Sequence, residues 1–151
     1  MLAKARSAVY AYTAGYEGKS VDAFLNELLE RGIEMVIDIR ANSVSRKHGF
    51  AGSQFSRLCK KLGFAYRHIP TLGISSSARK NLSDFNSYQR LLNRYEKEML
   101  PRRSAEVEDV CYLMQRQPSV LFCVEKDVMC CHRSRLARAV AQATDLKVVH
   151  L

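Results

Sequence analysis

The chain has 151 residues and lacks the long apolar segments of membrane and secreted proteins. The longest apolar run near its cysteine-rich segment is Val120–Val124, whereas a membrane-spanning helix needs about 20 apolar residues. The N-terminal letters MLAKARSAVYAY contain no extended apolar stretch, so no secretory signal is expected. We therefore expect a cytoplasmic protein that does not enter a membrane.

A disulfide framework is also lacking, because the five cysteines are an odd number without regular spacing. In a reducing compartment they are expected to be free thiols or metal ligands. A bridge between the neighbours Cys130 and Cys131 would be strained. Cys59 and Cys111 fall on the apolar faces of expected helices, so we place them in the core.

No lysine- or arginine-rich tail stands out, although the formal net charge is +9 and the isoelectric point about 9.5. Such a balance favours phosphate-bearing partners such as nucleotides, RNA or DNA. The other interpretation is that basic residues spread along the surface only keep the protein soluble. Internal repeats and domain linkers are absent too, so a single domain over residues 1–151 is expected.

Short β-type runs alternate with helical patterns along the chain. The expected strands are Ala8–Thr13, Glu34–Ile39, Phe64–Ile69, Ser119–Val124 and Lys147–Leu151. The expected helices are one capped by Ser20 and ended by Gly32, one capped by Ser53 and ended by Gly63, one capped by Ser83 and ended by Pro101, then Ser104–Arg116 and Cys131–Ala143. This order predicts one α/β domain with a mostly parallel, Rossmann-like central sheet of about five strands and helices on both faces.

Polar residues gather where the expected strands end. In a parallel sheet the ligand crevice lies beyond the carboxyl ends of the strands. The residues that fall there are Gly15, Tyr16, Gly18, Asp38, Arg40, Arg67, His68, Cys123, Glu125 and Asp127. A long loop after the third strand, Pro70–Leu82, is expected to flank the crevice, as lids and binding loops do. The sequence therefore predicts a binding or catalytic site at this edge.

The letters CHR, Cys131 to Arg133, open the last expected helix. Unpaired N–H groups and the helix dipole favour negative charge there, and both His132 and Arg133 add to that field. We expect the pKa of the Cys131 thiol to be lowered, which would make it a nucleophile or a redox-sensitive group. The alternative is a buried cysteine that packs the helix start.

A phosphate is the anion that this helix start would bind. Arg40 and Arg133 would grip it, with Arg46 and His132 nearby and backbone N–H groups completing the cradle. The turn from Gly15 through Tyr16 to Gly18 would let the backbone approach closely. The letters match neither GxGxxG nor GxxxxGK[ST], so a plain strand-to-helix turn remains the alternative.

Two carboxylates at the strand ends, Asp38 and Glu125, are candidate general acids or bases. They would equally serve as ion-pair partners that hold Arg40 and Arg133 in place. His68 either faces the crevice and assists catalysis or forms a structural hydrogen bond. Tyr16 either stacks on a base or covers the sheet edge.

Zinc is a competing interpretation of the cysteine-rich segment. Cys123, Cys130, Cys131 and His132 have the right ligand atoms. Their spacing speaks against a site, because Cys123 and Cys130 are too far apart for a CxxC knuckle and adjacent residues rarely share one metal. The sequence therefore assigns no metal ligand and identifies no cofactor.

The motifs TAGYEG, DIR followed by SRKHGF, YRHIPTLG, CVEKDVMCCHR and a terminal VVHL resemble the prokaryotic family called domain of unknown function 488. The resemblance covers about Val9 to Leu151. The family pattern marks Gly15, Tyr16, Gly18, Asp38, Arg40, Ser45, Arg46, Phe50, His68, Leu72, Gly73, Cys123, Glu125, Cys131, His132 and Arg133. Ala14, Ile74 and Val128 depart from it without removing a candidate polar group. The resemblance implies a compact α/β domain and names no reaction.

Taken together, these patterns favour an enzyme, a hydrolase or transferase that acts on a nucleotide or nucleic acid. Cys131 would be its nucleophile, with Asp38, Glu125 and His68 as acid, base or assistant. A cysteine phosphatase is disfavoured because neither Cys123 nor Cys131 begins a C-x5-R loop. The alternatives are a non-catalytic nucleic-acid-binding module and a zinc-binding scaffold.

Overall fold

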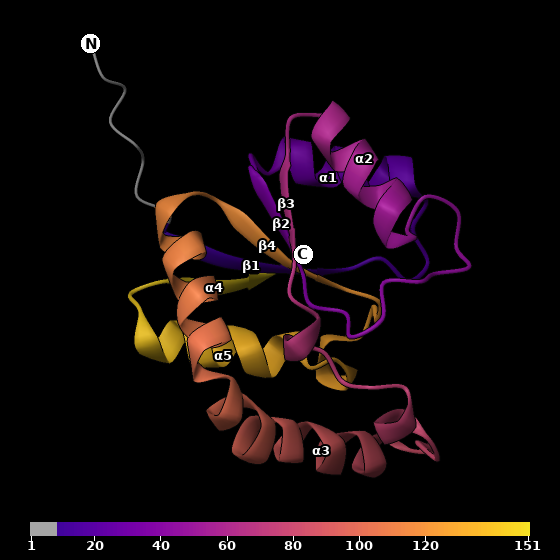
Figure 1. Ribbon diagram of the computed structural model, residues 1–151, viewed down its shortest axis with the longest axis vertical. Coiled ribbons are helices and arrows are strands. Elements are labelled where there is room, and N and C mark those ends of the chain that lie inside the picture. The colour runs from indigo at the N-terminus through magenta and orange to yellow at the C-terminus, as the bar shows by residue number, and fades with distance from the viewer. Residues whose placement is uncertain (1–8) are drawn as a thin grey trace.

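A five-stranded parallel sheet forms the centre of the computed structural model, which describes residues 9–151 (Figure 1). The strands are β1 (Tyr10–Gly15), β2 (Met35–Asp38), β3 (Ala65–His68), β4 (Ser119–Cys123) and β5 (Lys147–His150). Their order across the sheet is β3-β2-β4-β1-β5. Each pair is parallel, which confirms the expected fold class. Ala8 of the expected first strand, with the rest of 1–8, lies outside the described residues.

In the described part of the chain, five α-helices connect the strands. They are α1 (Val21–Glu30), α2 (Gly52–Lys61), α3 (Phe85–Arg94), α4 (Ser104–Arg116) and α5 (Arg133–Ala143). Short 3₁₀ turns occur at Pro70–Leu72, Ser77–Arg79, Leu100–Arg103 and Val128–Cys130. Over residues 9–151, none of the helices combines the length and the apolar character that crossing a membrane requires.

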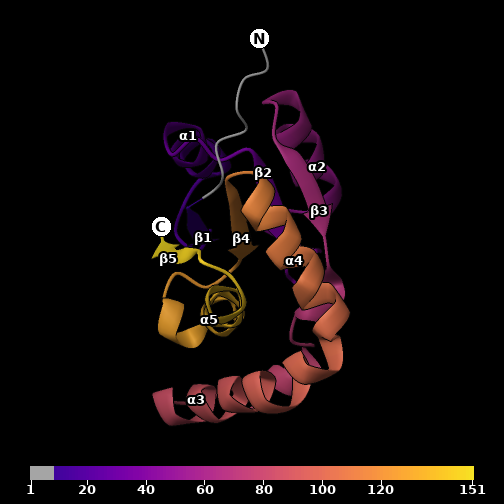
Figure 2. The same ribbon diagram turned by 90° about the vertical axis from the view of Figure 1, so that its left-hand side faces the viewer.

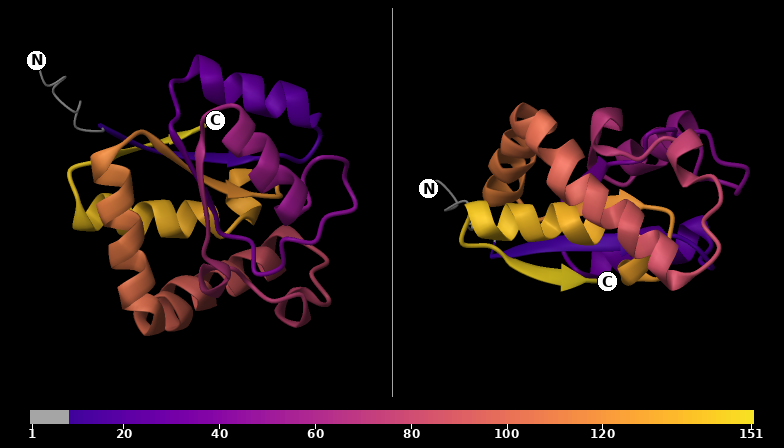
Figure 3. Two further views of the ribbon diagram at one scale, coloured as in Figure 1. Left: turned by 45° about the horizontal axis from the view of Figure 1, so that its top comes forward. Right: turned by 90° about the horizontal axis from the view of Figure 1, so that it is seen from below.

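Alternate side chains of the central strands β2 and β4 point to two separate hydrophobic cores, one on each face of the sheet. In β4, Val120 and Phe122 point to the core built with α1 and α2, while Leu121 and Cys123 point to the other core. The second core is covered by α4 and α5, and α3 lies beyond α5 on the side away from the sheet (Figure 2; Figure 3, right). The sheet is therefore buried on both faces, as parallel sheets generally are.

Two expected helix caps are wrong in their details. The third helix is capped by Asp84 and not by Ser83, because the Asp84 side chain accepts from the Ser87 backbone N–H while the Ser87 hydroxyl accepts from the Asp84 N–H. The second helix already begins at Gly52 after an extended Ala51, without a side-chain cap, instead of being capped by Ser53. Ser20 caps the first helix as expected, since its hydroxyl oxygen accepts from the Ala23 N–H.

Pro101 does not end the helical segment that contains α3. The chain leaves α3 at Arg94, widens into a π-helical turn at Tyr95–Met99 and tightens into the 3₁₀ turn that contains Pro101. It then continues directly into α4. A proline is tolerated there because it stands in the first turn of a new helical element, where its missing N–H costs no hydrogen bond.

Candidate functional site

The carboxyl ends of β2 and β4 meet the chain segment that leads into α5. That helix begins at Arg133 with His132 as its N-cap residue, two residues later than the expected start at Cys131. Cys131 itself is extended, with φ −126° and ψ 136°. The chain thus turns at Cys131 and His132, and both side chains face the end of β4.

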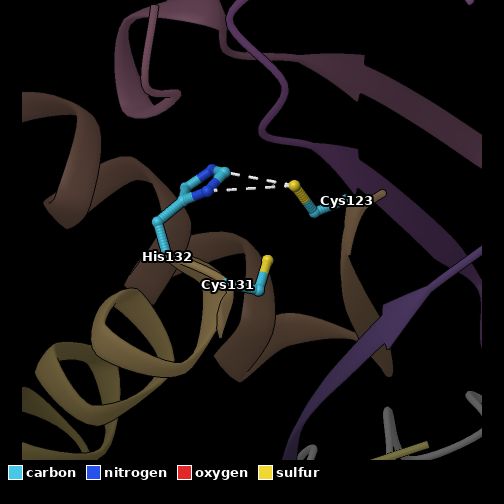
Figure 4. Close-up of side chains that lie close together, drawn as sticks. All are labelled: Cys123, Cys131 and His132. Atoms are coloured by element: carbon cyan, nitrogen blue, oxygen red, sulfur yellow. Dashed lines mark hydrogen bonds between the residues drawn. The ribbon is translucent and has the colours of Figure 1, made fainter. Parts of the chain in front are cut away.

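Three potential metal ligands converge at this turn. We call Cys123, Cys131 and His132 the Cys₂His cluster: their ligand atoms all lie within 4.8 Å of one another (Figure 4). Each residue is at most 1% exposed. The sequence spacing spoke against a metal site because adjacent residues rarely share one metal. That objection does not hold here, since the chain bends at Cys131 and His132 and directs both side chains at Cys123. Cys130 is not part of the cluster.

The ring of His132 is held by its far nitrogen. Nε2 lies 2.9 Å from the backbone oxygen of Ile39, just after β2. Because a carbonyl oxygen only accepts, Nε2 carries the proton and a neutral ring keeps its lone pair on Nδ1. Nδ1 lies 3.8 Å from Cys123 Sγ. Tyr95 meets the ring edge-on at 5.3 Å between centroids and fixes its tilt.

An ion pair borders the cluster. Arg79 Nη1 donates to Glu125 Oε1 at 2.5 Å, and Arg79 Nη2 lies 3.4 Å from His132 Nδ1. The Cys123 thiol donates to Glu125 Oε2 at 3.4 Å. Burial acts to raise the pKa of Glu125, but the charge of Arg79 and nearby hydrogen bonds outweigh it and lower that pKa below its usual value. Glu125 is therefore an ionised carboxylate at neutral pH.

Sequence reasoning missed Arg79. It stands in a 3₁₀ turn, Ser77–Arg79, within the long loop after β3. The loop's length was the only signal that this segment reaches the site, and it does not single out one residue. One of the two interpretations of Glu125 was an ion pair that holds Arg133 in place. The Glu125 carboxylate pairs with Arg79 instead, and from Glu125 the Arg133 guanidinium contacts only the backbone oxygen, to which it donates.

A small pocket of about 100 Å³ opens above the cluster and the ion pair. Its polar lining comes from Arg79, Glu125, Cys130 and His132, and its apolar lining from Ile74, Leu82, Tyr88, Leu91 and Leu92. The space suits a group the size of a phosphate or a coordinated water, and is smaller than the roughly 300–1,000 Å³ of pockets that enclose a drug-sized molecule.

The lowered pKa expected for the Cys131 thiol is wrong. Burial and the neighbouring Cys123 thiol raise the pKa of Cys131 well above its ordinary value, and His132 offsets only part of this. Since α5 begins two residues later, Cys131 does not occupy the helix start where the dipole would stabilise a thiolate. Without a bound cation it is a protonated, inaccessible thiol.

Asp38 and Arg40 form a buried ion pair at the carboxyl end of β2. Asp38 is completely buried and accepts from Arg40 Nε at 2.9 Å and Nη2 at 2.7 Å, and also from the Tyr66 hydroxyl. Arg40 Nη1 donates to the Phe50 backbone oxygen at 2.7 Å. Burial opposes the charge of Arg40, but the hydrogen bonds and charge of Asp38 hold its pKa above the usual value. This geometry favours the ion-pair interpretation of both residues over anion binding and acid–base catalysis.

Arg133 is likewise occupied by the protein. It is 1% exposed and donates from Nε to the Thr13 hydroxyl at 3.2 Å, from Nη1 to the Glu125 backbone oxygen and from Nη2 to the Lys126 oxygen. The loop that carries the Glu125 backbone oxygen passes so close to Gly15 that only glycine fits there. An added Cβ would lie 1.8 Å from that oxygen. The close approach expected at Gly15 is real, but the partner is the loop after β4.

The remaining candidates lie apart from the cluster. Tyr16 is 5% exposed and stacks on Phe50 at 4.1 Å, so it covers the sheet edge. His68 Nε2 lies 2.7 Å from the Arg40 backbone oxygen. This contact favours the structural hydrogen bond over a catalytic role for His68. Gly18 adopts φ +80° in the turn before α1, and Arg46 is exposed in the loop before α2. Of the expected site residues, the structure brings together Cys123, Glu125, Cys131 and His132.

Comparison with known proteins agrees with these motifs. A family model described as domain of unknown function DUF488 matches residues 20–140, and the chain belongs to this family. No curated protein and no solved structure matches it. The family description names no activity.

Proposed function

We propose that this member of the DUF488 family is an enzyme that acts on a phosphate-bearing substrate, a nucleotide or nucleic acid, in the pocket above the Cys₂His cluster. The observation that carries the proposal is the Arg79–Glu125 pair, which places a guanidinium and a carboxylate beside two thiols and an imidazole. A cation, a carboxylate and an imidazole that line one small pocket, with the two buried thiols behind them, are components of phosphoryl and nucleotidyl chemistry.

Arg79 takes the anion-binding role in place of Arg40 and Arg133. Its two contacts, to Glu125 and His132, engage two of the five N–H donors that a guanidinium carries. Its side chain is 30% exposed, whereas Arg40 and Arg133 are buried and bonded through all three of their side-chain nitrogens. A phosphate oxygen at the pocket mouth therefore meets Arg79 first, and bidentate contact with a phosphate is the geometry that arginine favours.

Glu125 is the acid or base of the proposal. Its Oε1 holds Arg79 and its Oε2 faces Cys123, so the carboxylate lies between the anion-binding group and the cluster. Because the pocket holds only a phosphate-sized group, the sugar and base of a nucleotide would lie outside it, against the loop from Pro70 to Leu82. The net charge of +9 assists the approach of such a substrate.

Calorimetry and turnover test the proposal together. Inorganic phosphate, a nucleoside monophosphate and a short single-stranded oligonucleotide are titrated into the full chain, and phosphate or nucleotide release is measured with the last two. We expect Arg79→Ala to weaken binding roughly 10- to 100-fold, the cost of one charge-assisted hydrogen bond. Glu125→Gln should lower turnover by roughly 100-fold or more while binding persists.

Arg57→Ala is the matched control, since Arg57 is an exposed arginine on α2, on the opposite face of the sheet. It removes the same charge without touching the pocket. Equal losses in Arg79→Ala and Arg57→Ala would mean that only the net charge attracts phosphate, and the pocket assignment would fall.

A non-catalytic nucleic-acid-binding module is the second candidate. A separate groove of about 360 Å³, lined by Thr71, Ser75, Arg102 and Arg103 among others, offers two adjacent arginines to a phosphate backbone. This candidate predicts oligonucleotide affinity that falls steeply with salt. It also predicts that Arg102→Ala weakens oligonucleotide binding more than Arg79→Ala does, with no turnover in either variant.

A further inference from the structure

We infer that the Cys₂His cluster is a zinc site with an open fourth position facing the pocket. Cys123, Cys131 and His132 supply the three protein ligands. Two thiolates and an imidazole are the donor set that selects zinc among the divalent ions that form tetrahedral sites. The inference rests on the geometry of the cluster, and it adds a Lewis acid to the proposed function without depending on the phosphate substrate.

The spacing of the ligand atoms fits a tetrahedral ion. Bonds of about 2.3 Å to sulfur and about 2.0 Å to nitrogen place neighbouring ligand atoms of a tetrahedral site roughly 3.5–3.8 Å apart. Cys123 Sγ lies 3.8 Å from His132 Nδ1, and all three ligand atoms fall within 4.8 Å of one another. Shifts of about 1 Å or less in side-chain position close the site, and the Cys131 sulfur points into the space between the other two ligands (Figure 4).

His132 is already oriented as a metal ligand. Ligating histidines donate their second ring N–H to a carboxylate or a backbone carbonyl, which fixes the tautomer and raises the basicity of the ligating nitrogen. Nε2 of His132 donates to the Ile39 carbonyl in this way, and Nδ1 is left facing Cys123. The carbonyl belongs to Ile39, the residue after β2, whose backbone N–H donates to the Phe122 oxygen of β4. Contact with the sheet therefore fixes the carbonyl that holds the ring.

Arg79 and Glu125 occupy the fourth side. Arg79 Nη2, 3.4 Å from Nδ1, is a cation facing the lone pair that the metal would take. When an ion enters, Arg79 gives up this contact and keeps its pair with Glu125 Oε1. Glu125 Oε2 then lies beside the fourth position. Three protein ligands and one open position next to a carboxylate are typical of catalytic zinc, whereas structural sites are closed by four.

Metal titration of the full chain, stripped with a chelator under reducing conditions, tests the inference. Co²⁺ alone is added first, and Zn²⁺ is then used to displace it. We expect one ion per chain, the intense visible bands of tetrahedral cobalt and the near-ultraviolet band of sulfur-to-cobalt charge transfer. Zinc X-ray absorption should count two sulfur and two lighter ligands. A cobalt spectrum without thiolate bands, or a count of four sulfurs, would overturn the inference.

Variants assign the ligands. Cys123→Ser, Cys131→Ser and His132→Ala should each weaken Zn²⁺ binding by more than the roughly 10- to 100-fold that loss of an outer partner costs. Cys130→Ser is the matched control, because this neighbour lines the pocket but lies outside the cluster. A loss in Cys130→Ser equal to that in Cys131→Ser would refute the ligand assignment. Circular dichroism checks folding, and the wild-type absorption spectrum decides the question if a variant fails to fold.

The two proposals fail separately. If wild type and Arg79→Ala both bind zinc but neither binds phosphate nor shows turnover, the metal site stands and the proposed function is wrong. If the metal-free wild type and Cys131→Ser bind phosphate equally and the wild type takes up no zinc, the anion pocket stands and the metal site is wrong.

Discussion

Replacing Arg40 by methionine gives a decisive test of what that arginine does. The substitution keeps an unbranched apolar side chain but removes the guanidinium, which donates from Nε and Nη2 to Asp38 and from Nη1 to the Phe50 oxygen. It also removes a cation that lies 4.7 Å from the centre of the Phe122 ring. Asp38, which is 0% exposed, would retain the Tyr66 hydroxyl as its hydrogen-bonding side chain.

The cost follows from the uncompensated charge. Removing one partner of a buried ion pair typically destabilises a protein by about 3–5 kcal/mol, a large share of the roughly 5–15 kcal/mol by which domains are stable. We therefore expect Arg40→Met to lower the free energy of unfolding by about 3–5 kcal/mol. The double variant Asp38→Asn/Arg40→Met should recover part of that loss, because it leaves no charge buried without a partner.

Urea unfolding at neutral pH, followed by circular dichroism, measures the effect as a lower midpoint at an unchanged slope. Phosphate binding is measured on the same samples under native conditions. A loss of stability below about 1 kcal/mol together with a large loss of phosphate affinity would refute the reasoning and return Arg40 to the anion-binding role. A double variant no more stable than Arg40→Met would show that lost packing, and not the unpaired charge, is the cause.

Three further outcomes are expected. Gly15→Ala should lower the free energy of unfolding by about 3 kcal/mol or more in urea, because the added Cβ would lie 1.8 Å from the Glu125 backbone oxygen. Gly32→Ala should lower it by only about 1 kcal/mol, because Gly32 has φ +70° but open space around the added Cβ. Equal losses in the two variants would contradict the steric argument. Iodoacetamide should label metal-free Cys131, 1% exposed, at least about tenfold more slowly than Cys130 by peptide mass spectrometry, and faster labelling of Cys131 would mean that the turn before α5 opens. Hydrogen bonds from Ser87 in the first turn of α3 lower the pKa of Asp84. The stabilisation by Asp84 is therefore complete above the ordinary carboxyl pKa of about 4 and is lost as pH falls through the lower folded-state pKa. The melting temperature of the wild type should exceed that of Asp84→Ala by less in acid than at neutral pH, and a difference that stays constant with pH would refute this.

Much of the fold was predictable because it depends on local periodicity. Short apolar runs indicated the strands, and apolar residues three and four apart indicated the helix faces. The order of these elements was enough to predict the parallel sheet and its two covered faces. Helix ends were less certain, since Asp84 and Ser83 are both good caps and only the reciprocal contact with Ser87 selects one. The passage of the helical segment through Pro101 had no local signal.

The place of the site was also contained in the sequence, since carboxyl ends of parallel strands share one edge. Which residues act there was not, because contacts between distant segments decide it. Arg79 reaches Glu125 across 46 positions, and His132 reaches the Ile39 carbonyl across 93. Burial then separates chemically similar groups: Arg40 and Arg133 are held by the protein, whereas Arg79 faces the pocket. Charge and residue type are properties of the sequence, while partners and solvent exposure arise only when the tertiary structure brings distant segments together.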